Sequence, residues 1–186
     1  MAASAMYAPP GARTVDMTQL RPLSVDTIFG RQLFHLSVRD IADLPPHLNL
    51  PSRHFALLLA WDAKEFSSKL ISNLASRLAD EGLAYLCAWG SDCERVHDVF
   101  DETLVERDID AGVKSLVMTT WHDEEDLKEV LWFFLNCTLP DDSLADDCNS
   151  GLVISVENDE WEREIVAALS DPASFSKRVL QDEPGE

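Results

Sequence analysis

Apolar runs alternate with polar, helix-starting residues four times along the chain. Three of the runs end in tryptophan, at Trp61, Trp89 and Trp121, and the fourth ends at Glu157. The apolar residues are consecutive, which is typical of a strand that is buried on both faces of a sheet. We therefore expect four strands, over residues 55–61, 83–89, 116–121 and 151–157.

Each expected strand is followed by apolar residues at helical spacing. After the first strand, for example, Leu70, Leu74 and Leu78 fall on one face of a helix. Strands that alternate with amphipathic helices predict an α/β protein, here a three-layer α/β/α sandwich. Its sheet is expected to be doubly wound and mostly parallel, with about four strands, as in Rossmann-like and flavodoxin-like folds.

The order of the strands in the sheet does not follow from the hydrophobic pattern alone. We expect the order second, first, third, fourth, with an extra edge strand from the N-terminal segment. Ligands of such sheets bind at the carboxyl ends of the strands, where the strand order reverses. The expected order would place this reversal between the first and the third strand.

The first 50 residues have a different pattern. Residues 1–24 contain small residues and prolines without periodicity, which is typical of a loose leader. Residues 27–43 form either a short strand or a helix, and the alternation from Leu33 to Val38 favours a strand. We therefore divide the chain into a partly disordered leader and connector over residues 1–50 and an α/β domain over residues 51–186.

The formal net charge is −19, and the acidic excess lies in the second half of the chain. Residues 1–90 contain 8 acidic and 8 basic residues, whereas residues 91–147 contain 17 acidic and 4 basic ones. A negative field of this kind repels nucleic acids and anionic membrane surfaces. It attracts divalent cations and basic proteins, or it serves only as a solvated surface that keeps the protein soluble.

The cysteines and the apolar stretches indicate in which cellular compartment the protein is expected. The chain has four cysteines and no close Cys-x-x-Cys pair. A domain of this size does not need disulfides, so we expect reduced thiols and a cytoplasmic location. No apolar stretch reaches the roughly 18 residues of a membrane span, and the N-terminus lacks the pattern of a secretory signal.

Polar residues follow the expected strands at the edge where ligands bind. Asp62, His122 and Asp123 are candidate catalytic residues, and Asp62, Asp123 and Glu157 are candidate metal ligands. Carboxylates that converge from several strands can bind a divalent metal such as Mg²⁺ or Mn²⁺, which then activates water. The histidine could act as a general base or as a ligand. The pattern thus predicts a metal-dependent hydrolase as one alternative.

The same acidic residues also have a structural interpretation. Asp62 and Glu65 have the spacing of a capping box, as do Ser91 and Glu94, so these side chains could satisfy backbone donors at helix starts. Acidic helix starts disfavour a nucleotide cofactor, because phosphates bind where a helix N-terminus is not already neutralised. Neither G-x-G-x-x-G nor G-x-x-x-x-G-K-[ST] occurs in the chain.

The strand-end tryptophans have two interpretations as well. Each is either the last core residue of its strand, or Trp61, Trp89 and Trp121 form an aromatic rim that anchors a partner. No complete catalytic motif accompanies the one-sided charge. We therefore favour a non-catalytic interaction module that binds a basic protein and needs no cofactor. The metal-dependent hydrolase is the alternative, so the sequence leaves open whether the protein is an enzyme.

Overall fold

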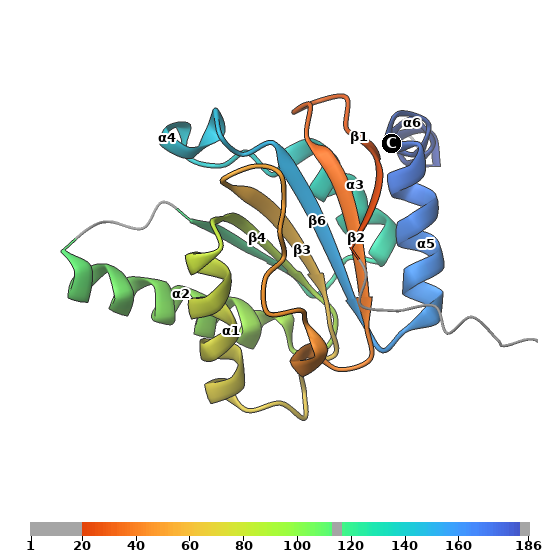
Figure 1. Ribbon diagram of the computed structural model, residues 1–186. Coiled ribbons are helices and arrows are strands. Elements are labelled where there is room, and N and C mark those ends of the chain that lie inside the picture. The colour runs from red at the N-terminus through yellow and green to blue at the C-terminus, as the bar shows by residue number, and fades with distance from the viewer. Residues whose placement is uncertain (1–19, 113–116, 183–186) are drawn as a thin grey trace, which may run out of the picture.

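A six-stranded, mostly parallel sheet lies between two layers of helices (Figure 1). The computed structural model describes residues 20–112 and 117–182. In spatial order the strands are β1 (Arg21–Val25), β2 (Gln32–Val38), β6 (Ser150–Val156), β3 (Phe55–Ala60), β4 (Leu83–Trp89) and β5 (Met118–His122). β1 runs antiparallel to β2, and all other neighbouring strands are parallel. The prediction of an α/β fold is therefore confirmed.

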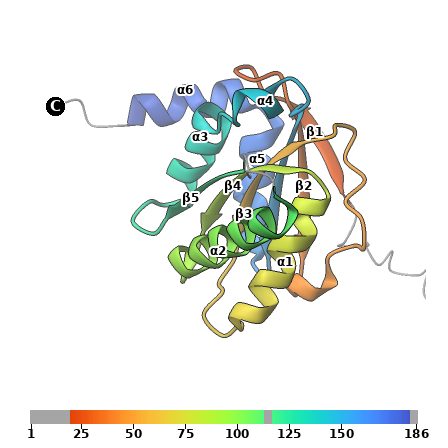
Figure 2. The same cartoon turned by 90° about the vertical axis from the view of Figure 1, so that its left-hand side faces the viewer.

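The helices divide between the two faces of the sheet. Helices α1 (Ser68–Asp80) and α2 (Cys93–Ala111) cover the face that is turned to the viewer in Figure 2. The other face carries α3 (Leu127–Cys137), α5 (Asp159–Ser170) and α6 (Pro172–Asp182). Two short helices, η1 (Ile41–Asp43) and α4 (Asp142–Ala145), lie in connections. None of these helices is both long and apolar enough to cross a bilayer.

The central strands are buried on both faces, as the consecutive apolar residues predict. In β3, Leu57 and Leu59 pack against the layer of α1 and α2, whereas Leu58 packs against the layer of α3 and α5. All three side chains are fully buried. Each stabilises the fold by about 1.5–3 kcal/mol relative to an exposed position. This double burial fixes β3 in the middle of the sheet.

The sheet has six strands, so the prediction of about four was wrong. The two additional strands, β1 and β2, come from residues that the sequence pattern assigned to the leader and connector. The alternation from Leu33 to Val38 does form a strand, as predicted. β1 was missed because it is a short edge strand that contains Pro22 and has no continuous apolar run. Residues 1–19 of the expected leader lie outside the described residues.

The predicted strand order was also wrong. The first expected strand, β3, lies between β4 and β6 rather than between the second and third expected strands. The chain moves from β3 through α1 to β4 and through α2 to β5, with both helices on one face. Helix α3 then returns over the other face and brings β6 next to β3. The order consequently reverses between β3 and β6.

A buried polar pair joins β2 to β6. The Nε2 atom of His35 lies 2.9 Å from the hydroxyl oxygen of Ser155, and both side chains are buried. Burial lowers the pKa of His35 to about 4, although the nearby carboxylate of Glu162 acts in the opposite direction. The folded protein therefore holds this imidazole in its neutral form at pH 7.

Replacing His35 with glutamine should change how stability depends on pH. The unfolded chain binds a proton at His35 near pH 6.5, whereas the folded protein does so only near pH 4. Protonation therefore favours unfolding in this window. As the pH falls from 6.5 to 4, the wild-type protein should lose about 3 kcal/mol of unfolding free energy that the variant retains.

Urea denaturation of both proteins at several pH values measures this difference. The matched control is His47→Gln, which removes an exposed imidazole and should keep the wild-type profile. Parallel pH profiles of wild type and His35→Gln would show that the burial of His35 does not affect acid stability.

Candidate functional site

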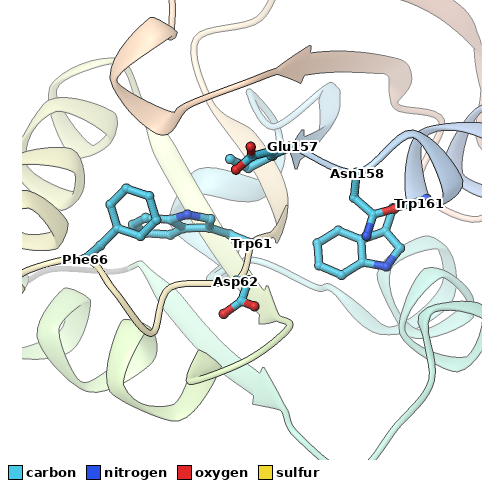
Figure 3. Close-up of a pocket in the computed structure, with 7 residues that line it drawn as sticks. Trp61, Asp62, Phe66, Glu157, Asn158 and Trp161 are labelled. Carbon is cyan, nitrogen blue, oxygen red and sulfur yellow. Dashed lines mark hydrogen bonds between the residues drawn. The ribbon is translucent and has the colours of Figure 1, made fainter.

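A pocket of about 320 Å³ lies at the carboxyl ends of β3 and β6 (Figure 3). The helices that follow these two strands, α1 and α5, lie on opposite faces of the sheet. The pocket therefore occupies the place where open α/β sheets bind their ligands. Its lining residues are Trp61, Asp62, Phe66, Val156, Glu157, Asn158 and Trp161.

Aromatic side chains form two opposite sides of the pocket, with the carboxylates between them (Figure 3). Trp61 is buried and packs against Phe66, with the ring centroids 4.8 Å apart. On the other side, Trp161 packs edge-on against Trp89 at 4.9 Å. The indole N–H of Trp61 has no acceptor among the described residues. A buried donor without a partner is rare in folded proteins, and this one belongs to a residue of the pocket wall.

A glycine allows the ends of β3 and β4 to approach each other. The backbone N–H of Trp61 donates a hydrogen bond of 2.9 Å to the carbonyl of Trp89. Gly90 follows with a φ of +112°, and a Cβ atom there would lie 2.4 Å from the carbonyl oxygen of Trp61. No other residue type fits this turn without moving the backbone. Gly90 thus helps to hold Trp61 at the pocket.

Asp62 is exposed and does not cap a helix. Helix α1 begins only at Ser68, and its N-cap is Ser67, whose side chain accepts a hydrogen bond from the N–H of Leu70. The predicted capping box of Asp62 and Glu65 was therefore wrong, because a turn separates the end of β3 from the helix. Among the described residues, the Asp62 carboxylate accepts a hydrogen bond only from the N–H of Lys64, at 3.5 Å, which is too long to be strong.

The second predicted capping box, of Ser91 and Glu94, does not form either. Helix α2 has Asp92 as its N-cap, in a left-handed conformation, and the Asp92 side chain accepts no hydrogen bond from the backbone of the first turn, so Ser91 does not cap the helix. Helix α3 has a complete capping box, but it consists of Asp126 and Glu129. The strand-end residue Asp123 is not its N-cap. Helix starts therefore account for fewer of the strand-end carboxylates than the spacing suggested.

Glu157 combines backbone strain with a carboxylate that has no partner. Its φ of 55° lies in the left-handed region, which is costly for a residue with a long side chain. Its backbone N–H donates a hydrogen bond of 2.8 Å to the carbonyl of Val38, which holds this conformation. The side chain is exposed and makes no hydrogen bond or ion pair within residues 20–112 and 117–182. The strain therefore turns a free carboxylate toward the pocket.

Asn158 positions one aromatic wall. It is the N-cap of α5, and its side-chain oxygen accepts hydrogen bonds of 3.0 Å from the N–H groups of Glu160 and Trp161. The cap fixes the first turn of the helix, and Trp161 extends from that turn beside the pocket (Figure 3). Trp161 is partly buried, packs against the core on the face of α3 and α5, and also lines the pocket. Its spacing matches the apolar face of α5, so the sequence pattern does not separate it from a core residue.

The predicted catalytic residues do not come together. Asp62 lines the pocket, whereas His122 and Asp123 belong to the end of β5, which β4 separates from β3. The Nδ1 atom of His122 lies 3.1 Å from the carboxylate of Glu125, and its Nε2 atom lies 3.2 Å from the hydroxyl of Thr120. Both ring nitrogens are thus engaged locally. His122 is buried, packs on Phe133 and does not line the pocket.

The candidate metal ligands are only partly brought together. Asp62 and Glu157 share the pocket, but Asp123 is not among its lining residues. In the described part of the chain, no group of three or more His, Cys, Asp or Glu side chains is arranged to hold a metal ion. Mg²⁺ often takes only one or two protein carboxylates and completes its shell with waters and substrate oxygens. Asp62 and Glu157 could therefore serve such an ion only together with other oxygen ligands, and the described residues do not form a complete metal site by themselves.

The three strand-end tryptophans have three different environments. Trp61 is buried in the pocket wall. Trp89 is partly buried, and its indole N–H donates a hydrogen bond of 2.9 Å to the carbonyl of Glu125. Trp121 is exposed and packs on His97, with the ring centroids 4.5 Å apart. Of the three, Trp121 is exposed on the surface, whereas Trp61 takes part in the pocket wall as a buried side chain.

Comparison with known proteins assigns a family but no activity. No curated protein and no solved structure matches the chain. A family model described as "Domain of unknown function (DUF7684)" matches residues 33–172. The matched region begins in β2, ends at the first residue of α6 and contains every residue that lines the pocket. The chain therefore belongs to the family of this domain, DUF7684.

Proposed function

We propose that the protein is a non-catalytic interaction module for a basic protein, and that the pocket between β3 and β6 receives a lysine or arginine side chain of this partner. One observation carries the proposal: the carboxylates of Asp62 and Glu157 line the same pocket, and neither caps a helix nor forms an ion pair among the described residues. Two such carboxylates repel each other until a cation binds between them.

The aromatic walls support a cationic ligand with an apolar stem. The methylene groups of lysine or arginine can pack against Phe66 and Trp161, while the charged end reaches the carboxylates. A cation over an aromatic ring gains about 0.5–1 kcal/mol at an exposed site. The volume of about 320 Å³ is at the lower end of the range for ligand sites, which suits one side chain better than a large cofactor.

The charge of the whole protein supports the same class of partner. The formal net charge of −19 creates a field that speeds the approach of a basic protein and slows that of a nucleic acid. A phosphate group is disfavoured at the pocket itself. The first turn of α5 contains Asp159, Glu160 and Glu162, which oppose the binding of an anion at that helix start.

Two broader inferences accompany this proposal. The reversal of strand order between β3 and β6 supports a doubly wound sheet of the Rossmann-like or flavodoxin-like kind. All four cysteines are free thiols, which supports a reducing compartment such as the cytoplasm. Both inferences agree with an intracellular module that recognises a basic protein.

Removing the two pocket charges should weaken the binding of a lysine peptide. The probe is tetralysine, and the variant is Asp62→Asn combined with Glu157→Gln. Each exposed ion pair contributes up to about 1 kcal/mol, so we expect the Kd to rise about tenfold. Isothermal titration calorimetry at low salt measures this change, and a peptide with acetylated lysines should not bind.

The matched control for this experiment is Glu65→Gln. Glu65 is an exposed acid in the same turn as Asp62, but it does not line the pocket. Its replacement should change the Kd by less than about twofold, because only the long-range field is altered. Equal losses in the control and in the double variant would contradict a specific site, as would strong binding of the acetylated peptide.

Replacing Glu157 with glycine should stabilise the protein and weaken tetralysine binding at the same time. Glycine relieves the left-handed strain of about 1–2 kcal/mol but loses more entropy on folding, so we expect a net gain of about 0.5–1 kcal/mol. Urea denaturation measures the gain. Asn49→Gly is the control, because Asn49 has a similar φ of 52° and asparagine tolerates it better. A loss of stability in Glu157→Gly would show that the side chain has a structural role.

A further inference from the structure

β5 is an edge strand without the features that usually block pairing. It pairs with β4 on one side, and no strand of the described residues lies on its other side. The opposite edge strand, β1, contains Pro22 and an irregular register between Pro22 and Ser24, and both features hinder the addition of a strand. The segment Met118–His122 has no proline, no lysine and no register shift. Its outer edge is therefore open to pairing.

Apolar side chains gather at this open edge. Met118 is 48% exposed and Trp121 is 42% exposed, although both belong to a strand. On the neighbouring helix α2, Val105 and Ile109 are also exposed. Met118 and Trp121 are consequently the exposed apolar side chains that β5 itself presents beside its open edge. Exposed apolar side chains beside unpaired backbone groups suit an interaction surface.

The side chains of β5 are held next to an acidic helix. Trp121 packs on His97 of α2. The hydroxyl of Thr119 donates a hydrogen bond of 2.6 Å to the carboxylate of Asp101, which also belongs to α2. An added strand at the outer edge of β5 would thus run along this side of α2.

The charges on α2 select a basic occupant. Asp98, Asp101, Glu102 and Glu106 are exposed, whereas the two arginines of α2, Arg95 and Arg107, already form ion pairs with Asp92 and Asp80. The imidazole of His97 contacts Asp98 and Asp101. In the described part of α2, no lysine or further arginine balances Glu102 and Glu106. An extended segment with lysine or arginine at alternate positions would place its charges along them.

We propose that an extended basic segment of a partner protein binds to β5 as an additional strand. Main-chain hydrogen bonds to the open edge would give affinity, and the carboxylates of α2 with Trp121 would give selectivity. A second copy of the chain is a poor occupant, because edge-to-edge pairing would bring two acidic α2 helices together. This proposal takes from the proposed function only the basic character of the partner. The two binding sites are separate, because β4 lies between β5 and the pocket strand β3.

The test uses a short peptide of alternating lysine and valine and the double variant Asp62→Asn/Glu157→Gln, in which the pocket charges are absent. Binding should persist in this variant and should protect the backbone amides of β5 from hydrogen exchange. Adding Glu102→Lys or Trp121→Ala to this double variant should raise its Kd for the lysine–valine peptide about fivefold to tenfold. Glu102→Lys changes only an exposed helix position, so it tests the proposal even if Trp121→Ala folds poorly.

The matched control is Val25→Ala on β1, which removes an exposed apolar side chain from the opposite edge strand and should leave the Kd unchanged. A peptide of alternating glutamate and valine should not bind. Three results would each overturn the proposal: unprotected β5 amides in the complex, equal binding of the glutamate peptide, or dimerisation of the protein through β5 in sedimentation experiments. If tetralysine does not bind at the pocket, the proposed function fails but the proposal for β5 does not. The two proposals can therefore be refuted separately.

Discussion

The parallel pairing of β3 with β6 is the contact on which the rest of the structure depends. The two strands align from Phe55 with Ser150 to Ala60 with Ser155, without a register shift. Because α1 and α5 leave these strands toward opposite faces of the sheet, no helix closes the space beyond their carboxyl ends. The pairing thus creates the pocket, and its register decides which residues reach it.

That register brings two acidic residues together that are far apart in the sequence. Asp62 follows the end of β3, and Glu157 follows the end of β6, so both emerge at the same edge of the sheet. The arrangement is costly, because Glu157 has a left-handed backbone and the buried indole N–H of Trp61 finds no acceptor in residues 20–112 and 117–182. A strained backbone and an unpaired buried donor lower the stability of the folded protein. Costs of this kind concentrate at functional sites.

The sequence predicted the elements of this fold better than their arrangement. Continuous apolar runs such as Phe55–Ala60 identify strands that are buried on both faces, and all four expected strands were confirmed. The position of β6 could not be predicted in the same way, because it depends on which face α3 crosses. β1 was missed because an edge strand needs no apolar run, and its proline resembles a loop signal.

The candidate site was predicted only in part, for a related reason. Asp62 and Glu157 were identified as strand-end carboxylates, and both line the pocket. The spacing of Asp62 and Glu65 resembles a helix cap, but the chain makes a turn before α1 begins at Ser68. Trp161 fits the apolar stripe of α5, and Phe66 lies in the turn before α1 at a spacing that continues the stripe of that helix, so nothing in their spacing distinguished the pocket wall from the core. Sequence patterns report local geometry, whereas the pocket arises from the crossing of distant segments.

The most direct test of the account is an NMR titration of the ¹⁵N-labelled protein with tetralysine, followed through the indole N–H signals. Trp61 and Trp161 line the pocket, whereas the indole N–H of Trp132 on α3 is buried elsewhere. We expect the signals of Trp61 and Trp161 to shift and saturate together with the amides of Asp62 and Glu157, while the Trp132 signal stays in place. Saturable binding that leaves the Trp61 and Trp161 signals unchanged would contradict it.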